Sequence, residues 1–257
     1  MCRMNERALS FDAVAEQYDT ARPGYPPALF DAIEAATGRP LRGARVVDVG
    51  AGTGIATRLL RERGARVVAV EPGPGMAARL RLSVPDVPLV RGFGDALPLA
   101  DASADLITYA QAWHWTDPAR SLPEAMRVLR PGGALALWWN VSDRAVPWIA
   151  EQDARLREET GGQAHGAHGT GERDRHLPTG PETVRRRVPW SRRVPLRTHL
   201  DNLGSHSVFR VLGDEATTAF LDRERDELLR LFPDGTVEES YVVELTLTFR
   251  PPASSSQ

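Results

Sequence analysis

A glycine-rich turn after a short apolar run constrains the fold of this chain more than any other feature. The run and the turn read VVDVGAGTG over residues 46–54, and residues 55–60 have the apolar spacing of a helix. Glycine is required where the backbone adopts positive φ or approaches another group closely. The order predicts a buried strand, a tight turn and a helix N-terminus, an arrangement that often binds ligands in α/β folds.

Strand-like and helix-like patterns alternate after this turn. Short apolar runs at 67–70, 89–90, 106–109 and 134–139 are separated by segments with helical spacing. The alternation is typical of parallel strands joined by right-handed crossover helices. We therefore expect an α/β fold with a doubly wound, mostly parallel sheet.

One local signal bears on the last crossover helix. Ser121 and Glu124 have capping-box spacing ahead of residues 125–129. This spacing predicts a helix N-terminus at Ser121.

The C-terminal part has a different composition. The glycine- and histidine-rich stretch 161–171 has little to bury and predicts a mobile loop. Beyond it, the patterns indicate a strand over 188–194 and a charged amphipathic helix over 215–232. Apolar and polar residues alternate over 241–249, which predicts a half-buried antiparallel strand at the sheet edge.

The 257 residues, 42% of them hydrophobic, suffice for one domain with a sizeable core. We expect a single domain over 1–257, with a helical cover at 1–40, a cofactor-binding core at 41–148, a lid or cap at 149–235 with a mobile loop near 160–180, a final strand at 236–250 and a tail at 251–257.

Composition excludes several chemistries. All 32 basic residues are arginine, so lysine Schiff bases and the lysine of a triphosphate-binding loop are excluded. Cys2 is the only cysteine, so no intrachain disulfide or cysteine zinc site can form. The net charge of −2 gives no global reason to expect nucleic acid or an anionic membrane. We expect a cytoplasmic protein, and the arginine-rich composition favours a GC-rich bacterial source and a role in specialised metabolism.

The ligand of the turn follows from spacing and charge. A dinucleotide turn has the pattern G-x-G-x-x-G, whereas here the glycines are 50, 52 and 54, and Asp48 precedes them where its charge would repel a pyrophosphate. Glu71 ends the next strand, where a carboxylate binds ribose hydroxyls. A ribose joined to an ammonium group without phosphate is S-adenosylmethionine. The alternatives are a turn without a ligand and an NAD-dependent oxidoreductase, which Asp48 and the spacing disfavour.

Several motifs occur in the order of a known family. VVDVGAGTG, VVAVEPGPGM, ALPL, AQAWHW and EAMRVLRPGGALALWW resemble the successive motifs of class I S-adenosylmethionine-dependent methyltransferases, over residues 11–148. FDAVAEQYDTARPGYP and AWHW resemble the small-molecule enzymes of the UbiE and trans-aconitate type. The resemblance implies a seven-stranded Rossmann-like sheet with an antiparallel C-terminal edge strand and a small cap. It implies methyl transfer from S-adenosyl-L-methionine to a small organic acceptor by in-line displacement, with S-adenosyl-L-homocysteine as product.

The resemblance also assigns cofactor contacts. Relatives place an Asp after the third strand against the adenine amine, but this chain has Phe93 at that position, followed by Gly94 and Asp95. Tyr18, Arg22 and Tyr25 resemble a cover over the methionine end; alternatively, the tyrosines are core residues and Arg22 makes a surface ion pair. The expected cofactor-binding set is Tyr18, Arg22, Tyr25, Asp48, Gly50, Ala51, Gly52, Thr53, Glu71, Pro72, Met76, Phe93, Gly94, Asp95 and Gln111.

The acceptor is expected beyond the fourth strand. Methyl transfer mainly requires alignment of the acceptor and exclusion of water, tasks that aromatic side chains suit. The expected acceptor-binding residues are Trp113, His114, Trp115, Trp139 and His206. His114 is the candidate base; alternatively, it holds the loop as a structural residue.

Other clusters have competing readings. His165, His168 and His176 lie in or near the glycine-rich stretch, which offers no fixed coordination geometry, so no metal is expected. The arginines at 185–187 and 192–193 fit a strand with one solvated face; a nucleic-acid surface or attraction of an anionic acceptor are the alternatives.

A different function class stays open beside methyl transfer. The same fold can bind the cofactor and act as a cyclase, a scaffold or a regulatory subunit. We expect no partner other than the small-molecule acceptor, no membrane contact, and a monomer or homodimer.

Overall fold

The computed structural model describes residues 22–161, 177–179, 182–206 and 209–252. The predicted cover residue Tyr18 and the histidines at 165, 168 and 176 lie outside these residues, as does most of the predicted loop at 160–180.

Within the described residues the strands form one seven-stranded sheet of order β3-β2-β1-β4-β5-β7-β6. The strands are β1 (Arg45–Val49), β2 (Arg66–Val70), β3 (Leu89–Val90), β4 (Ala104–Ala110), β5 (Leu129–Ser142), β6 (Thr183–Pro195) and β7 (Thr236–Phe249). Strands β1 to β5 pair in parallel, and β7 pairs antiparallel to both β5 and β6. The prediction of a doubly wound, mostly parallel, Rossmann-like sheet is confirmed.

The position of the C-terminal strand differs from the prediction. β7 is antiparallel, as predicted, but it lies between β5 and β6, and the edge strand is β6. The alternating pattern of β7 does not mark one solvated face, because Thr246 and Thr248 on its polar side are buried as well. β6 is longer than the predicted 188–194, and its outward face carries Arg185, Arg187, Pro189 and Arg193, residue types that discourage pairing of an edge with other chains.

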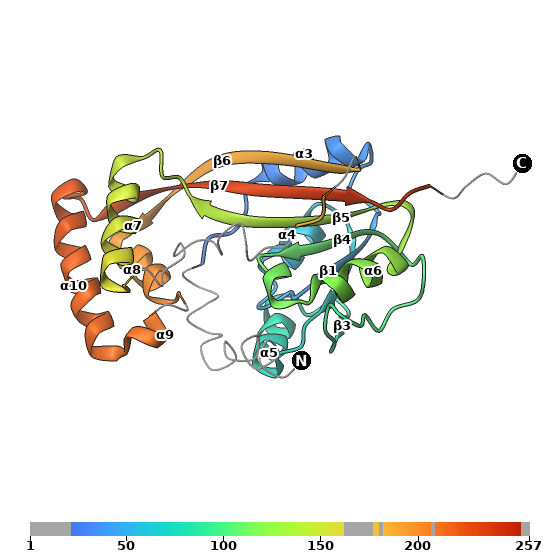
Figure 1. Ribbon diagram of the computed structural model, residues 1–257, viewed down its shortest axis with the longest axis horizontal. Helices are drawn as coiled ribbons and strands as arrows, with labels where there is room; N and C mark the ends of the chain where they lie inside the picture. The colour runs from blue at the N-terminus through green and yellow to red at the C-terminus, as the bar shows by residue number, and fades with distance from the viewer. Residues whose placement is uncertain (1–21, 162–176, 180–181, 207–208, 253–257) are drawn as a thin grey trace, which may run out of the picture.

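Helices cover both faces of the core (Figure 1). α3 (Pro27–Thr37), α4 (Ile55–Glu62) and α5 (Pro74–Ser83) contribute buried residues to one apolar cluster, and α6 (Pro118–Val128) packs with a second cluster on the opposite face. Neighbouring residues of each strand divide between the two clusters: Val46 belongs to the first and Val47 to the second. This is the two-residue period of a strand buried on both faces.

The predicted capping box is wrong. α6 begins at Pro118, and Asp117 caps it by accepting a hydrogen bond from the backbone N–H of Ala119 at 3.1 Å. Ser121 lies one turn inside the helix and donates to Asp95. Proline is favoured in the first turn of a helix, so the N-cap lies four residues earlier, at Asp117, than the Ser–Glu spacing indicated.

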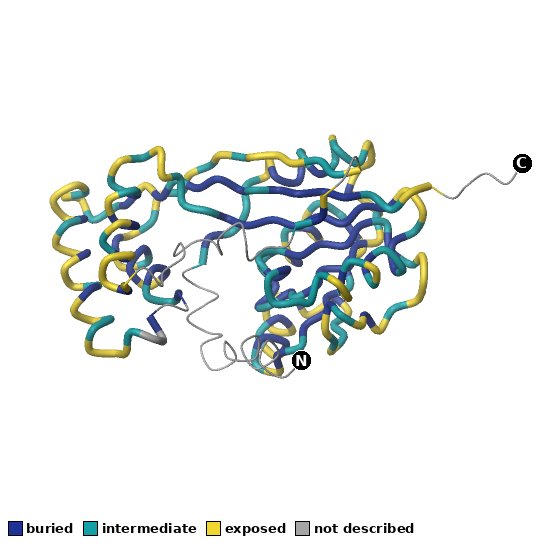
Figure 2. The backbone as a smooth tube through the Cα atoms, viewed as in Figure 1, coloured by how far each residue is buried: buried dark blue, intermediate teal, exposed yellow. Residues whose placement is uncertain are grey.

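Four helices form a separate group at one end of the molecule (Figures 1 and 2). They are α7 (Pro147–Glu159), α8 (Leu196–Gly204), α9 (Phe209–Leu212) and α10 (Asp214–Leu231), the last matching the predicted helix over 215–232. β5, β6 and β7 run from the core to this group, which we call the helical cap. Its residues form two small apolar clusters of their own.

A buried polar network holds the cap to the sheet. Glu239 on β7 accepts hydrogen bonds from Arg192 at 2.5 Å and is 2.7 Å from Nδ1 of His199 on α8. His199 in turn contacts Gln152 on α7, which donates to Glu224 on α10 at 3.0 Å. Burial opposes the ionised form of Glu239, but the contacts with His199 and Arg192 prevail and lower its pKa to about 2. The network links five elements, β6, β7, α7, α8 and α10.

Candidate active site

The glycine turn has the backbone geometry that its sequence predicts. Gly50, Gly52 and Gly54 have φ of 67°, 58° and 95°, in the left-handed region that only glycine enters at low cost. A Cβ on Gly50 would lie 2.5 Å from Cβ of Ala112, whereas a Cβ on Gly52 would meet nothing within 4 Å. Gly50 therefore serves packing against the segment after β4, and Gly52 leaves open space in front of the turn.

Glu71 binds this turn to the end of β2. Its Oε2 accepts from the backbone N–H of Gly52 at 2.8 Å, and its Oε1 accepts from that of Gly73 at 2.7 Å. These two hydrogen bonds orient the Glu71 carboxylate. The carboxylate lies at the carboxyl edge of β1 and β2, the side where α/β sheets bind ligands.

Asp48 does not face the open side of the turn, contrary to the prediction. Its side chain is fully buried, and it accepts hydrogen bonds from Thr57 at 2.6 Å and Thr108 at 2.9 Å. Burial raises the pKa of Asp48 to about 6, although the two threonine hydroxyls act in the opposite direction. The hydroxyl groups that hydrogen-bond Asp48 thus belong to the protein itself. Thr57 lies on α4 and Thr108 on β4, so Asp48 links β1 to both elements.

The segment after β3 carries two residues of the predicted site, the apolar Phe93 and the acidic Asp95. Phe93 is 39% exposed, which is unusual for a large apolar residue. Asp95 does not face an open site, because its Oδ1 accepts from Ser121 at 2.6 Å and from the backbone N–H of Asp117 at 3.0 Å. A Cβ on Gly94 would lie 2.8 Å from the hydroxyl of Tyr109, so glycine is required there for close packing.

The remaining residues around the turn are mostly buried. Ala51 and Met76 are core residues by exposure, while Pro72 is half-buried. Thr53 is buried, and its hydroxyl has no hydrogen-bond partner within the described part of the chain. Gln111, just past β4, has φ of 56° and donates its backbone N–H to Trp138 at 2.8 Å. Positive φ in a non-glycine residue is costly and is often found at functional sites.

The aromatic segment after β4 forms a short 3₁₀ helix, η2 (Trp113–Trp115). Trp113 does not line an open site: it is fully buried and packs edge-on against Tyr109, with ring centroids 4.9 Å apart. His114 stacks at a tilt against Trp115, with centroids 4.3 Å apart, and its Nδ1 accepts the indole N–H of Trp139 at 3.3 Å. The structure therefore brings His114, Trp115 and Trp139 together, but Trp113 and Trp139 are both buried in the core, whereas His114 and Trp115 are half-buried. Successive residues of a 3₁₀ helix point in directions about 120° apart, which separates Trp113 from its neighbours.

The predicted cover is described only from Arg22 onward. Arg22 donates to the backbone oxygen of Ser205 in the cap at 3.3 Å, and its own carbonyl accepts from Arg192 at 3.4 Å. The ring of Tyr25 packs edge-on against Trp138, with centroids 5.6 Å apart, which favours the core reading for this tyrosine. His206 is buried at the end of α8, next to Ser205.

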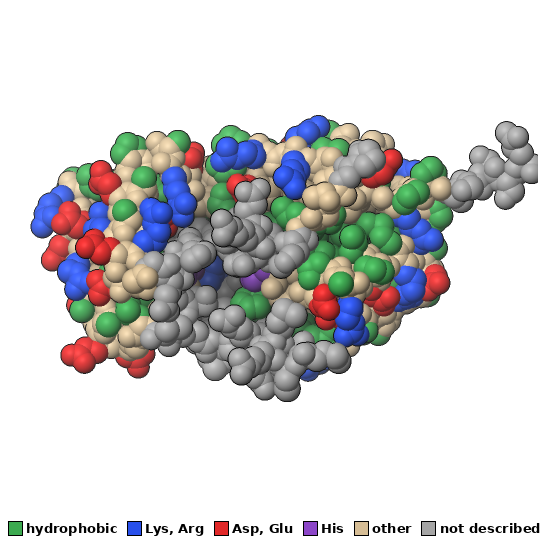
Figure 3. Space-filling view, in the orientation of Figure 1, with side chains coloured by type: hydrophobic (Ala, Val, Ile, Leu, Met, Phe, Trp, Pro, Cys, Tyr) green, Lys and Arg blue, Asp and Glu red, His purple; other side chains and the backbone are tan. Residues whose placement is uncertain are grey.

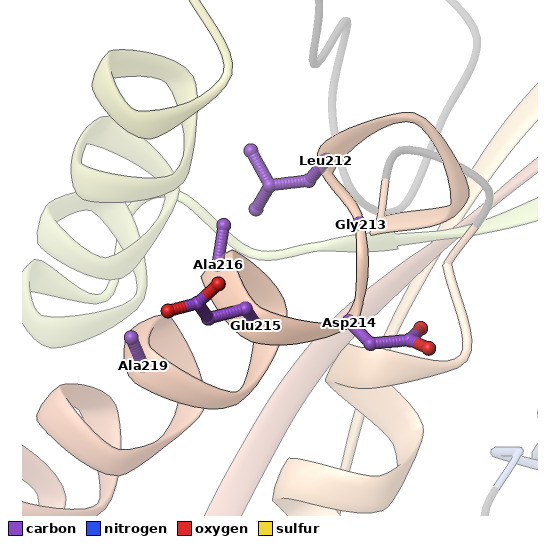
Figure 4. Close-up of a pocket in the computed structure, with 6 residues that line it drawn as sticks. All are labelled: Leu212, Gly213, Asp214, Glu215, Ala216 and Ala219. Carbon is purple, nitrogen blue, oxygen red and sulfur yellow. The ribbon is translucent and has the colours of Figure 1, made fainter.

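Figure 3 shows a hollow between the core and the helical cap, with histidine and basic side chains at its floor. The carboxyl ends of β4 and β5 point toward this region (Figure 1). A shallow groove of about 550 Å³ lies elsewhere, at the start of α10 (Figure 4), and none of the predicted site residues lines it.

Sequence reasoning missed four residues that the structure places near the site. Thr57 and Thr108 donate hydrogen bonds to Asp48, just before the turn, and the hydroxyl of Tyr109 packs close to Gly94. Glu244 on β7 lies directly opposite Trp139 on β5. The alternation of apolar and polar residues in β7 placed Glu244 on the polar side of the strand. Because the strand was expected at the sheet edge, that side was expected to face solvent.

Comparison with known proteins identifies the family. Residues 47–137 match the model of a methyltransferase domain. An uncharacterised methyltransferase of Mycobacterium tuberculosis is 39% identical over 90% of both chains. A demethylmenaquinone methyltransferase of Renibacterium salmoninarum is 33% identical over 52% of this chain and 59% of its own. The solved structure of a candidate type II methyltransferase from Anaeromyxobacter dehalogenans is 26% identical, covers 90% of this chain and 99% of its own, and has a TM-score of 0.63.

The fold and the glycine turn define a class I methyltransferase. With these relatives, the chain belongs to the class I S-adenosylmethionine-dependent methyltransferases. No helix in the described part of the chain has the length and apolarity needed to cross a membrane.

Proposed function

We propose that the protein transfers a methyl group from S-adenosyl-L-methionine to a small organic acceptor, with the cofactor over the glycine turn and the acceptor beyond the ends of β4 and β5. Figure 1 shows that these strands end toward the helical cap. The proposal divides the site into a nucleoside side at β2 and β3 and an acceptor side at β5.

The position of Glu71 carries the proposal. Its two hydrogen bonds to the N–H groups of Gly52 and Gly73 hold the carboxylate between the two turns that follow β1 and β2. A carboxylate at the end of the second strand suits the two hydroxyls of a ribose. Phe93, exposed after β3, offers an apolar surface for the adenine ring in place of the usual Asp contact.

The aromatic group suits the acceptor side. His114 and Trp115 form a wall at the end of β4, and the buried Trp139 of β5 supports His114 from behind. Such a wall excludes water and aligns a planar acceptor with the sulfonium methyl, the main requirements of an in-line displacement. The demethylmenaquinone methyltransferase, which matches 52% of this chain, supports a small-molecule acceptor of the UbiE type.

Calorimetry with S-adenosyl-L-homocysteine tests the proposal. Wild-type protein should bind it saturably and should give no heat with NADH. Glu71→Gln keeps one acceptor oxygen and loses the charge, so its Kd should rise about 10- to 100-fold. Glu62→Gln, an exposed carboxylate on α4 paired only with Arg58 among the described contacts, is the matched control and should bind like wild type. Saturable NADH binding without any binding of the homocysteine product would overturn the proposal.

A further inference from the structure

The strand order continues the site past β5. Gly50 packs against Ala112, and Gln111 donates to the backbone of Trp138, so the turn, the end of β4 and β5 are consecutive neighbours. On β5, Trp139 is paired with Glu244 of β7, and Glu244 is paired with Arg187 of β6. A row of side chains therefore leads from the aromatic wall across two further strands.

The members of this row point to one face of the sheet. Directly paired residues of antiparallel strands have Cβ atoms about 4.5–5.5 Å apart on the same side. Trp139 belongs to the apolar cluster on the α6 face. Glu244 and the next residues of its face, Thr246 and Thr248, therefore lie on that face as well.

This polar face of β7 is not a solvent face. Thr246 is 4% exposed, Thr248 is 8% exposed and Glu244 is partly buried. Partial burial of a carboxylate in an interior strand costs free energy unless a partner or a ligand recovers it. Arg187 provides a positive charge in the paired position, and Arg185 lies diagonally beside it, opposite Thr246; Trp139 faces Glu244 from the other side.

His114 is poorly placed to accept a proton. Its Nδ1 lone pair accepts the indole N–H of Trp139, so in the neutral ring the proton resides on Nε2. The ring can donate a hydrogen bond from Nε2 to an acceptor molecule. The proton of that molecule needs another destination.

We propose that Glu244 receives the proton of the acceptor, and that the acceptor carries an O–H or N–H group on an aromatic body. The inference rests on the proposed function. In the step, the acceptor's oxygen or nitrogen forms a bond to the methyl carbon while the bond from carbon to sulfur breaks and its electron pair stays on sulfur. The acceptor proton passes to the Glu244 carboxylate and then to water, leaving the methylated product and S-adenosyl-L-homocysteine.

The test uses purified full-length protein, S-adenosyl-L-methionine and a panel of simple phenols and arylalkylamines, with phenylacetate and benzoate as carboxylates that have no proton to lose at neutral pH. Formation of S-adenosyl-L-homocysteine is measured by mass spectrometry. Glu244→Gln should lower kcat about 10²- to 10⁴-fold, leave KM within a few-fold, and abolish the fall in kcat on the acid side of the pH profile. Glu244→Asp should restore part of the rate.

Glu238→Gln is the matched control, because Glu238 is an exposed carboxylate on the same strand. Binding of S-adenosyl-L-homocysteine by Glu244→Gln should equal that of wild type, which also shows that the variant is folded. If the wild-type protein does not bind S-adenosyl-L-homocysteine, the proposed function itself is wrong. Normal binding together with an unchanged pH profile in Glu244→Gln, turnover of the carboxylates alone, or no turnover of any phenol or amine would overturn the role of Glu244.

Discussion

Trp139 donates its indole N–H to Nδ1 of His114 across 3.3 Å, and this contact gives His114 a defined orientation beside Trp115. A neutral imidazole held in this way presents N–H at Nε2, so it can orient an acceptor atom but cannot take its proton there. The contact therefore favours an orienting role for His114 over the role of a base.

His114→Asn tests that distinction. The asparagine amide oxygen can accept the Trp139 N–H where Nδ1 did, so the variant should retain kcat within about tenfold of wild type. Loss of a general base would instead cost about 10²- to 10⁴-fold. Steady-state kinetics with any acceptor that the wild-type protein methylates provides the measurement. His114→Ala, which loses the hydrogen bond as well, should be the weaker enzyme, and equal large losses in both variants would return the base role to His114.

Asp48 should make stability depend on pH. Its folded-state pKa of about 6 lies above its ordinary value of 3.8, because burial disfavours the charged form. The folded protein therefore holds a proton that the unfolded chain releases between these pH values, and the free energy of unfolding falls as pH rises from 4 to 6, by at most about 3 kcal/mol. The stabilising effect of the proton is full below pH 4 and absent above pH 6.

Asp48→Asn removes this titration while keeping side-chain size and hydrogen bonding. Urea unfolding at pH 4.5 and pH 8 should show that the variant gains stability relative to wild type on going to the higher pH, by about 1–3 kcal/mol. Asp201→Asn, at an exposed position on α8, should show no such change. A difference between Asp48→Asn and wild type that is the same at both pH values would contradict the prediction.

Local patterns were sufficient to predict the first half of the fold. The strand at 46–49, the three glycines and the crossover helices depend on residues close in sequence, and their period is visible without long-range information. The site residues that follow from the turn itself, Gly50, Gly52 and Glu71, lie where the sequence indicated.

The errors concern contacts between distant segments. The side chain of Asp48 points toward the Thr108 hydroxyl, 60 residues away in the chain. A local sequence pattern contains no information about such a distant contact. β7 reads as an edge strand because its alternation is real, but its neighbour β6 is set by pairing across the sheet. Trp113 and Trp115 look equivalent in AWHW, yet the 3₁₀ geometry of η2 sends one into the core and leaves the other half-buried.

Gly50 and Gly52 offer a matched pair of substitutions that separates packing from ligand binding. Both have φ near 60°, so alanine at either position costs about 1–2 kcal/mol of backbone strain. Gly50→Ala adds a clash with Ala112, because the new Cβ would lie 2.5 Å from the Ala112 Cβ. Gly52→Ala adds none, since its Cβ would project into open space.

We therefore expect Gly50→Ala to lower the thermal unfolding temperature more than Gly52→Ala does. In correctly folded protein, Gly52→Ala should weaken binding of S-adenosyl-L-homocysteine more than Gly50→Ala does. The methyl group added at position 52 would occupy the space in front of the turn where the cofactor approaches the backbone. Differential scanning calorimetry and titration calorimetry on the same preparations measure both effects. If Gly52→Ala binds the product as tightly as wild type, the cofactor does not lie against this part of the turn.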